Sequence, residues 1–377
     1  MKQVPVVDLA QSDEALIVQQ VADACSTAGF FQVVNHGISS QLVHQFRQQC
    51  RAYFTQLPAA AKDQQRRTST NARGYFDDEL TKQRLDWKQA LDVGVPGSRN
   101  WNLPDDHARN ACLDGFNQFP SELPEFRETL VDYFRACEDL ADRLARIMYR
   151  GIVSDHQSDN KSQEQESNTN TTDIVQQLKE QHTSYLRMNY YPVFSATELD
   201  EEKKTDPAPL GVSPHKDAGF LTVLLQDDDC YSLQVWMDDH WQTVVPVPGA
   251  LTINTGDMAQ IWSNGHYKAP LHRVLTNKDK ERFSAPFFYN PGYQSYIQPV
   301  ATDQPVYHPC LWGYFRAVRF AGDFTDLGVE IQIEDYEIAS DEESKVHPNI
   351  RRQRKFAKVA RMDEPFSVEN FRDLLCE

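Results

Sequence analysis

The stretch FLTVLLQD, residues 220–227, opens a series of short apolar runs that indicates a β-rich fold. Val, Leu, Ile, Thr and aromatic residues fill these runs, and Gly, Pro, Asn and Asp separate them. Short strands repeated at intervals of about eight to twelve residues are typical of a β-sandwich or barrel. The later runs are SLQVWM (232–237), HWQTVVPV (240–247), ALTINTGD (250–257), AQIWSNG (259–265), LHRVLTN (271–277) and RFSAPFFYN (282–290).

Upstream of these runs the sequence mixes strand and helix patterns. Apolar residues three and four positions apart predict helices, and short runs rich in Val and Phe predict strands. Gly29 and Pro58 each follow a predicted helix and end it. The predicted strands cover residues 4–9 and 30–34, and the predicted helices cover residues 15–28, 40–57 and 121–150.

Two polar segments are predicted to lie at the surface. Residues 154–172, SDHQSDNKSQEQESNTNTT, are rich in Ser, Asn and Gln, which indicates a disordered or mobile loop. Residues 351–358, RRQRKFAK, are basic, and we interpret them as a solvated helix face.

The composition disfavours several classes of protein. The 377 residues include 38 basic and 55 acidic side chains, and the resulting net charge of −17 repels nucleic acid and anionic membrane surfaces. No run reaches the ~18 apolar residues of a spanning helix. The seven cysteines include no CxxC pair, so a zinc ribbon is not indicated. We expect a soluble, cytoplasmic monomer that binds small molecules and neither nucleic acid nor membranes.

The segment SPHKDAGF, residues 213–220, carries the first candidate metal ligands, His215 and Asp217. Residues two apart in an extended chain point to the same face, so the imidazole and the carboxylate converge. Taken alone, this triplet also fits a surface histidine beside a turn aspartate. His272, in the strand-like LHRV, supplies the second histidine of a two-His, one-carboxylate facial triad, as in non-haem Fe(II) oxygenases. His266 is the rival, but it lies in a Gly/Asn turn, whereas ligands belong on rigid strands.

Arg282 and Ser284 again place two functional side chains on one face of a strand. The turn-forming sequence TNKDKE precedes them, so we predict a hairpin that brings Arg282 next to His272. A guanidinium in an apolar strand needs a partner, because burial of an unpaired charge is unfavourable. A bound dicarboxylate would be such a partner, with a hydrogen bond from the serine hydroxyl.

These motifs and their order resemble the Fe(II)/2-oxoglutarate oxygenases of the isopenicillin N synthase-like family. The segment LRMNYYPVF (186–194) is similar to the Asn-Tyr-Tyr-Pro segment of that family, and the apolar runs from residue 220 follow it in the family's order. The resemblance extends over nearly all of residues 4–293. Its N-terminal parts are VPVVDL (4–9), AGFFQVVNHGI (28–38), RGYF (73–76) and GFNQFP (115–120).

The resemblance implies roles for individual residues. It places the iron ligands, which are also the catalytic residues, at the triad named above. The far carboxylate of 2-oxoglutarate would bind Arg282 and Ser284. Tyr191 and Asn189 match positions that contact this cosubstrate, and Phe288 matches a position that faces the primary substrate. Lys216, between the first two iron ligands, should point away from the iron.

The resemblance also implies a double-stranded β-helix, or jelly roll, of about eight core strands flanked by N-terminal helices. The expected division is an N-terminal region (1–120), a scaffold helix with a polar loop (121–184), a catalytic core (185–293) and a C-terminal extension (294–377). Fe(II) would be the cofactor and 2-oxoglutarate the cosubstrate, with ascorbate as a candidate reductant.

The implied reaction oxidises an unactivated C–H of a small organic molecule with O₂ and gives succinate and CO₂. Hydroxylation, desaturation and ring closure all remain open as outcomes of this reaction. The resemblance also implies a role in specialised metabolism, in which such relatives usually act. Three alternatives also remain: an iron oxidase of the same fold that dispenses with 2-oxoglutarate, a catalytically silent binding module, and a carboxylate-binding sensor.

Overall fold

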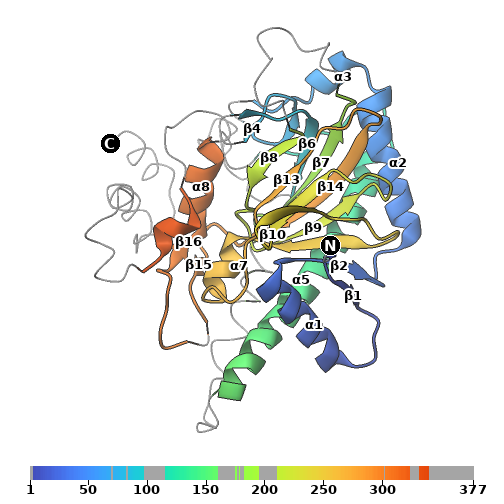
Figure 1. Cartoon of the computed structure of the whole chain (residues 1–377). Coiled ribbons are helices and arrows are strands. Elements are labelled where there is room, and N and C mark those ends of the chain that lie inside the picture. The colour runs from blue at the N-terminus through green and yellow to red at the C-terminus, as the bar shows by residue number, and fades with distance from the viewer. Residues whose placement is uncertain are drawn as a thin grey trace, which may run out of the picture.

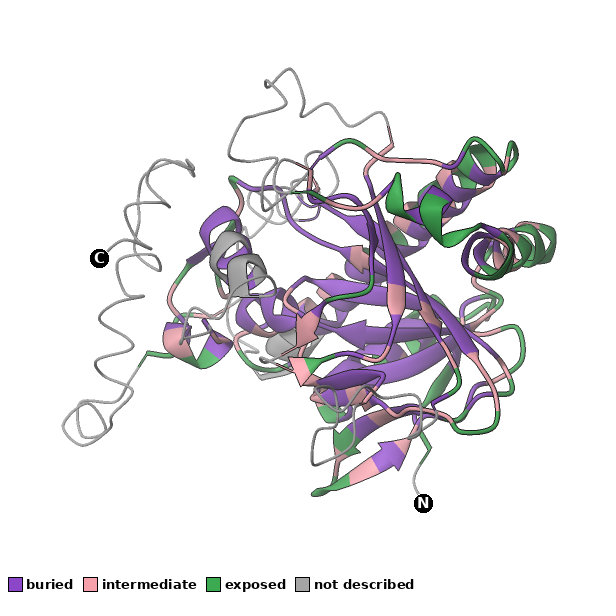
Figure 2. Cartoon of the chain, turned by 90° about the horizontal axis from the view of Figure 1, so that it is seen from above, coloured by how far each residue is buried: buried purple, intermediate pink, exposed green. Residues whose placement is uncertain are grey.

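The computed structural model describes residues 3–68, 71–81, 84–96, 115–159, 175, 178, 182–194, 210–300, 302–322 and 331–338. Two β-sheets lie at the centre of the described part, and helices cover the outer face of the larger one (Figure 1). Most residues of the central strands are buried, as Figure 2 shows. None of the described helices is long and apolar enough to cross a membrane.

Eight consecutive strands form the predicted jelly roll, with four in each of the two sheets. The apolar runs explain this confirmed pattern, because strands of the larger sheet are buried at nearly every position and β10 and β13 of the smaller sheet at alternate positions. The larger sheet contains β7 (Tyr185–Tyr191), β9 (Leu221–Gln226), β12 (Leu251–Thr255) and β14 (Arg282–Tyr289). The smaller sheet contains β8 (Val212–His215), β10 (Leu233–Met237), β11 (His240–Thr243) and β13 (His272–Val274).

N-terminal strands extend the larger sheet to eight strands in the order β1-β2-β12-β9-β14-β7-β6-β3. The added strands are β1 (Val6–Asp8), β2 (Phe30–Val34), β3 (Gly74–Phe76) and β6 (Gln89–Gly94). Two small sheets pair β4 (Leu80–Thr81) with β5 (Arg84–Leu85) and β15 (Tyr296–Ile297) with β16 (Cys310–Leu311).

Helix α5 (Phe126–Asp159) packs its apolar face on β9 and β14, and α1 (Glu14–Thr27) and α2 (Ser40–Gln56) pack against α5. Phe46 stacks on Tyr133 at 3.9 Å between ring centroids, and Phe134 meets Phe287 of the sheet edge-on at 5.0 Å. The other helices of the described residues are α3 (Ala59–Asp63), α7 (Asp257–Trp262), α8 (Trp312–Gly322) and the 3₁₀ helix η3 (Ile333–Tyr336).

Three expectations about these elements were wrong. The segment AQIWSNG was expected to be a strand, but α7 covers residues 257–262, since Asp-Met-Ala-Gln contains good helix formers and no β-branched residue. The long helix begins at Phe126, after Pro124, rather than at residue 121. It also continues to Asp159, so the predicted loop cannot begin at residue 154. Residues 160–172 and 351–358 lie outside the described residues.

The predicted hairpin between LHRVLT and RFSAPFF was also wrong. Strand β13 pairs with β10 and β8 in the smaller sheet, whereas β14 pairs with β7 and β9 in the larger sheet. The connection between β13 and β14 therefore crosses from one sheet to the other. His272 and Arg282 reach the space between the sheets from opposite sides.

Candidate metal centre

All eight site residues expected from the sequence line one cavity between the two sheets, with a volume of about 160 Å³. The smaller sheet and the loop after β8 contribute the three candidate metal ligands. Strands β7 and β14 of the larger sheet contribute the others. The eight residues are His215, Asp217, His272, Arg282, Ser284, Tyr191, Asn189 and Phe288.

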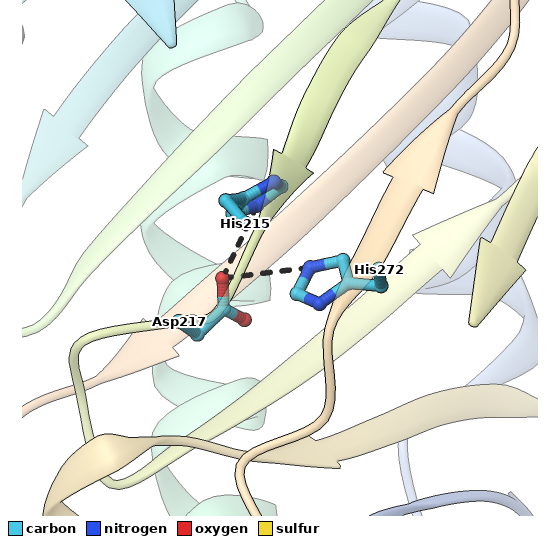
Figure 3. A group of neighbouring side chains, drawn as sticks. All are labelled: His215, Asp217 and His272. Carbon is cyan, nitrogen blue, oxygen red and sulfur yellow. Dashed lines mark ion pairs between the residues drawn. The ribbon is translucent and has the colours of Figure 1, made fainter. Parts of the chain in front are cut away.

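The candidate ligands His215, Asp217 and His272 converge with one ligand atom each, all within 4.8 Å of one another (Figure 3). Each histidine Nε2 lies 3.6 Å from Asp217 Oδ1. Strand pairing explains this convergence, because His272 lies opposite His215 in the register of β13 with β8. His266 is not part of the cluster.

Backbone carbonyls orient both imidazoles. His215 Nδ1 lies 2.8 Å from the Ser213 carbonyl oxygen, and His272 Nδ1 lies 3.1 Å from the Pro270 carbonyl oxygen. A carbonyl only accepts, so Nδ1 donates in both rings and the lone pair resides on Nε2. Both Nε2 atoms are the ones that face Asp217, which is the arrangement that a metal ion requires.

Two side chains orient the Asp217 carboxylate. Its Oδ2 accepts hydrogen bonds from Thr222 Oγ1 at 2.6 Å and from Asn254 Nδ2 at 2.7 Å. Both donors are buried. Since Oδ2 is occupied, Oδ1 is the oxygen directed at the histidines.

The protonation of the cluster suits a divalent cation. Burial and the neighbouring His215 lower the pKa of His272 to about 4, which leaves the ring neutral at pH 7. Burial raises the pKa of Asp217, but His272 and His215 lower it more, and it lies well below its usual range. Two neutral imidazoles and one carboxylate form the donor set of the non-haem iron facial triad, so these residues fit that metal.

Strands β7 and β14 form the floor of the cavity next to this cluster. Side chains alternate along each strand, so every second residue faces the cavity. Arg282 lies opposite Tyr191, and Ser284 lies opposite Asn189. Further along the same two strands Phe288 lies opposite Tyr185, and their rings stack at 4.7 Å.

Arg282 is 1% exposed, and its contacts are with neutral groups. Its Nη1 donates to Ser284 Oγ at 3.3 Å and its Nη2 to Gln226 Oε1 at 3.1 Å, while its Nε has no hydrogen-bond partner among the residues that the structure describes. Within the described part of the chain, no carboxylate lies at ion-pair distance from this guanidinium. A buried cation of this kind fits a bound carboxylate.

Lys216 points away from the metal cluster, as expected, and its Nζ donates to Glu334 Oε1 of η3 at 3.1 Å. Arg319 of α8 donates from Nη2 to the Lys216 carbonyl oxygen at 3.2 Å. Both contacts connect the C-terminal part of the described chain with the loop that carries the ligands.

Sequence reasoning missed a chain of buried charges in the cavity wall. Lys88 Nζ lies 2.6 Å from Glu79 Oε2 and 3.0 Å from Asp86 Oδ2. Arg187 Nη1 lies 2.9 Å from the same Glu79 oxygen, and Arg187 Nε lies 2.7 Å from Asp92 Oδ1. The alternation along β7 could have identified Arg187, but nothing in the sequence places residues 79–92 beside it.

The sequence matches two family descriptions. Residues 182–291 match the 2OG-Fe(II) oxygenase superfamily, and residues 4–122 match the N-terminal region of non-haem dioxygenase in morphine synthesis. Jasmonate-induced oxygenase 2 of Arabidopsis thaliana is 34% identical over 328 residues, which cover 83% of this chain and 78% of the relative. Flavanone 3-dioxygenase 2 of Oryza sativa subsp. japonica is 36% identical over 292 residues, which cover 76% and 73%.

Solved structures agree with these matches. The crystal structure of JOX2 in complex with 2OG, Fe and JA has a TM-score of 0.69, 31% sequence identity and 90% coverage of both chains. The dioxygenase for auxin oxidation in rice has a TM-score of 0.61 at 22% identity, with 85% of this chain and 95% of that chain covered, and it shows the same fold. This chain therefore belongs to the 2OG-Fe(II) oxygenase superfamily and is a 2-oxoglutarate-dependent dioxygenase that uses iron.

Proposed function

We propose that His215, Asp217 and His272 hold Fe(II), and that Arg282 with Ser284 binds the far carboxylate of 2-oxoglutarate. The observation that carries this proposal is that a facial triad and a buried guanidinium, which has no carboxylate partner among the described residues, line the same cavity. When bound, iron would activate O₂, which is the oxidant, and 2-oxoglutarate, on its conversion to succinate and CO₂, would supply two of the four electrons that O₂ takes up.

The protein's own contribution is orientation and exclusion of water. The carbonyls of Ser213 and Pro270 fix the two imidazoles, so the ligand atoms need no rearrangement when the metal binds. In this proposal Arg282 sets the direction of the 2-oxo acid. The buried Tyr191 and Asn189 complete its binding surface. A fixed geometry of this kind lowers the entropic barrier of the reaction.

The substrate that we propose is a small, partly apolar organic molecule, oxidised at an unactivated C–H by hydroxylation, desaturation or ring closure. The stacked rings of Phe288 and Tyr185 form an aromatic wall of the cavity, and Trp312 of α8 lines it as well. The JOX2 structure contains JA, and flavanone 3-dioxygenase 2 of Oryza sativa subsp. japonica is named for flavanone. These two molecule classes are the natural starting points for a substrate search.

We also propose that residues 185–293 are the catalytic core, because all eight candidate site residues lie within this range. Neighbouring parts of the chain complete the cavity. Glu79 and Lys88 contribute from the N-terminal region, and Arg316 and Arg319 of α8 contribute from the C-terminal part.

The test is oxygen uptake by the Fe(II)-loaded protein with 2-oxoglutarate, ascorbate as reductant, and a substrate panel that begins with JA and flavanones. The proposal predicts that one compound stimulates O₂ uptake and that succinate forms in equal amount to the O₂ consumed. Oxygen uptake without succinate would instead support an iron oxidase that dispenses with 2-oxoglutarate. Binding of a compound without turnover would support a silent binding module or a sensor.

A further inference from the structure

Strand β9 supports both halves of the site from one face. Its alternate residues Thr222 and Leu224 line the cavity, and Gln226 is the next residue in that row. Thr222 holds the Asp217 carboxylate, as described above. Gln226 lies opposite Ser284 in the register of β9 with β14, and its side chain contacts Arg282, which does line the cavity.

Gln226 is held on three sides. Its Oε1 accepts from Arg282 Nη2 at 3.1 Å, and its Nε2 donates to Thr252 Oγ1 at 3.3 Å. A guanidinium only donates, so the orientation of this amide is fixed by its partner. The backbone carbonyl of Gln226 accepts from Arg47 Nη2 of helix α2 at 2.9 Å. With 5% of its surface exposed, Gln226 has little freedom to move away from Arg282.

The last residue of β9 and the residue after it differ in charge and in the side of the strand that they occupy. Gln226, on the cavity side, is neutral, and the next residue, Asp227, is on the opposite side. Asp227 accepts from the Phe283 backbone N–H at 2.8 Å and from Arg51 Nη2 of α2 at 2.9 Å. The Asp227 carboxylate therefore pairs with Arg51 of helix α2 rather than with Arg282. Arg282 donates a hydrogen bond to the neutral Gln226 amide of β9, so this contact does not neutralise the positive charge of the guanidinium.

We propose that Gln226 is a positioning and specificity residue that aims the Arg282 guanidinium with a neutral amide and so keeps its charge available for a dicarboxylic 2-oxo acid. The inference rests on the proposed role of Arg282 in binding 2-oxoglutarate. A carboxylate at position 226 would form an internal ion pair with Arg282. It would abolish the preference for a cosubstrate with a second carboxylate, because the charge that this carboxylate recognises would already be neutralised.

The test measures binding rather than turnover. Protein loaded with redox-inert Mn(II) is titrated calorimetrically with 2-oxoglutarate and with 2-oxovalerate, which has the same five-carbon chain but lacks the second carboxylate. For Gln226→Glu, we expect the affinity for 2-oxoglutarate to fall by about ten-fold or more, because a buried charge pair is lost. The affinity for 2-oxovalerate should stay within about two-fold, because that molecule makes no ion pair with Arg282. Gln226→Met, which loses only the hydrogen bond, should weaken 2-oxoglutarate by about three- to ten-fold.

A matched control exists in the smaller sheet. Gln234 of β10 accepts from Arg273 Nε at 2.9 Å across the strand pair, but Arg273 does not line the cavity, whereas Arg282 does. Gln234→Glu makes the same chemical change at a Gln–Arg pair and should leave the binding of both 2-oxo acids unaltered.

The outcomes separate this inference from the proposed function. Failure of the Mn(II)-loaded wild-type protein to bind 2-oxoglutarate would overturn the proposed function and this inference with it. Wild-type binding with an unchanged ratio of the two affinities in Gln226→Glu would overturn this inference alone. If circular dichroism shows that Gln226→Glu does not fold, Gln226→Met decides: selective loss of 2-oxoglutarate affinity supports the inference, and an equal change for both molecules contradicts it.

Discussion

The support of Asp217 by Asn254 and Thr222 gives a quantitative prediction about metal affinity. Asn254→Ala removes a 2.7 Å hydrogen bond to a charged oxygen at a site where Asn254 is 2% exposed. A hydrogen bond to a charged group contributes about 1.5–3 kcal/mol. Since about 1.4 kcal/mol corresponds to a factor of ten in an equilibrium constant, metal affinity should fall by about 10- to 100-fold.

Thr222→Val should have an effect of similar size, because its 2.6 Å bond ends on the same oxygen, Asp217 Oδ2. Either donor alone still restrains the carboxylate, whereas loss of both lets it rotate. The two substitutions share this partner, so their effects should not be additive, and the double variant should lose more affinity than the product of the single effects.

The assay is an anaerobic competition between the protein and a coloured chelator for Fe(II), with Mn(II) calorimetry as a second readout. Asn35 provides the matched control, since its Nδ2 donates to Asp8 Oδ1 at 2.8 Å on the exposed surface, far along the chain from the ligands. Its φ of 52° favours glycine as the replacement, so Asn35→Gly is the variant to use. A folded Asn254→Ala protein whose metal affinity stays within about two-fold of wild type would refute the reasoning.

Three further predictions follow from the cavity walls. Arg282→Met should raise the KM for 2-oxoglutarate by roughly 30-fold or more, because truncation of one partner of a buried ion pair costs about 2–5 kcal/mol, and an unchanged KM would point to another cosubstrate. Phe288→Ala should raise the KM of the primary substrate and leave that of 2-oxoglutarate unaltered, and equal changes in both would contradict the assignment of this wall. Burial raises the pKa of Glu79, but Arg187 and Lys88 lower it more, so its folded pKa lies below the ordinary 4.5. The Glu79 carboxylate therefore makes its full contribution to the free energy of unfolding above pH 4.5, and this contribution decreases as the pH falls below that value. In acid unfolding curves the Glu79→Gln protein should be less stable than wild type at neutral pH, and its stability should depend less on acid.

Local pattern was sufficient to predict most strands and the metal cluster. His215 and Asp217 are two residues apart on an extended segment, so their convergence needs no knowledge of the rest of the fold. His272 was identified by residue type and by its place on a rigid strand. The structure then showed why it meets the other two, since β13 pairs directly with β8.

Non-local pairing explains what the sequence did not predict. The turn-forming sequence TNKDKE favoured a hairpin, but a connection of seven residues between β13 and β14 can equally cross to another sheet. The supporting residues Thr222, Asn254 and Gln226 act through strands β9 and β12, whose neighbours are known only from the sheet order. For Thr222 and Gln226 the available signal was a polar side chain in a mainly apolar strand, whereas β12, LTINT, offers no such contrast for Asn254.

The central claim is that the triad binds iron and that 2-oxoglutarate binds to that iron beside Arg282. The most direct measurement is an anaerobic titration of the Fe(II)-loaded protein with 2-oxoglutarate, followed through the visible absorption band of the chelated 2-oxo acid. We predict that the band develops in the wild-type protein and is lost in His272→Ala, with an unchanged circular dichroism spectrum. Iron binding without the band, or a band that persists in His272→Ala, would contradict the claim.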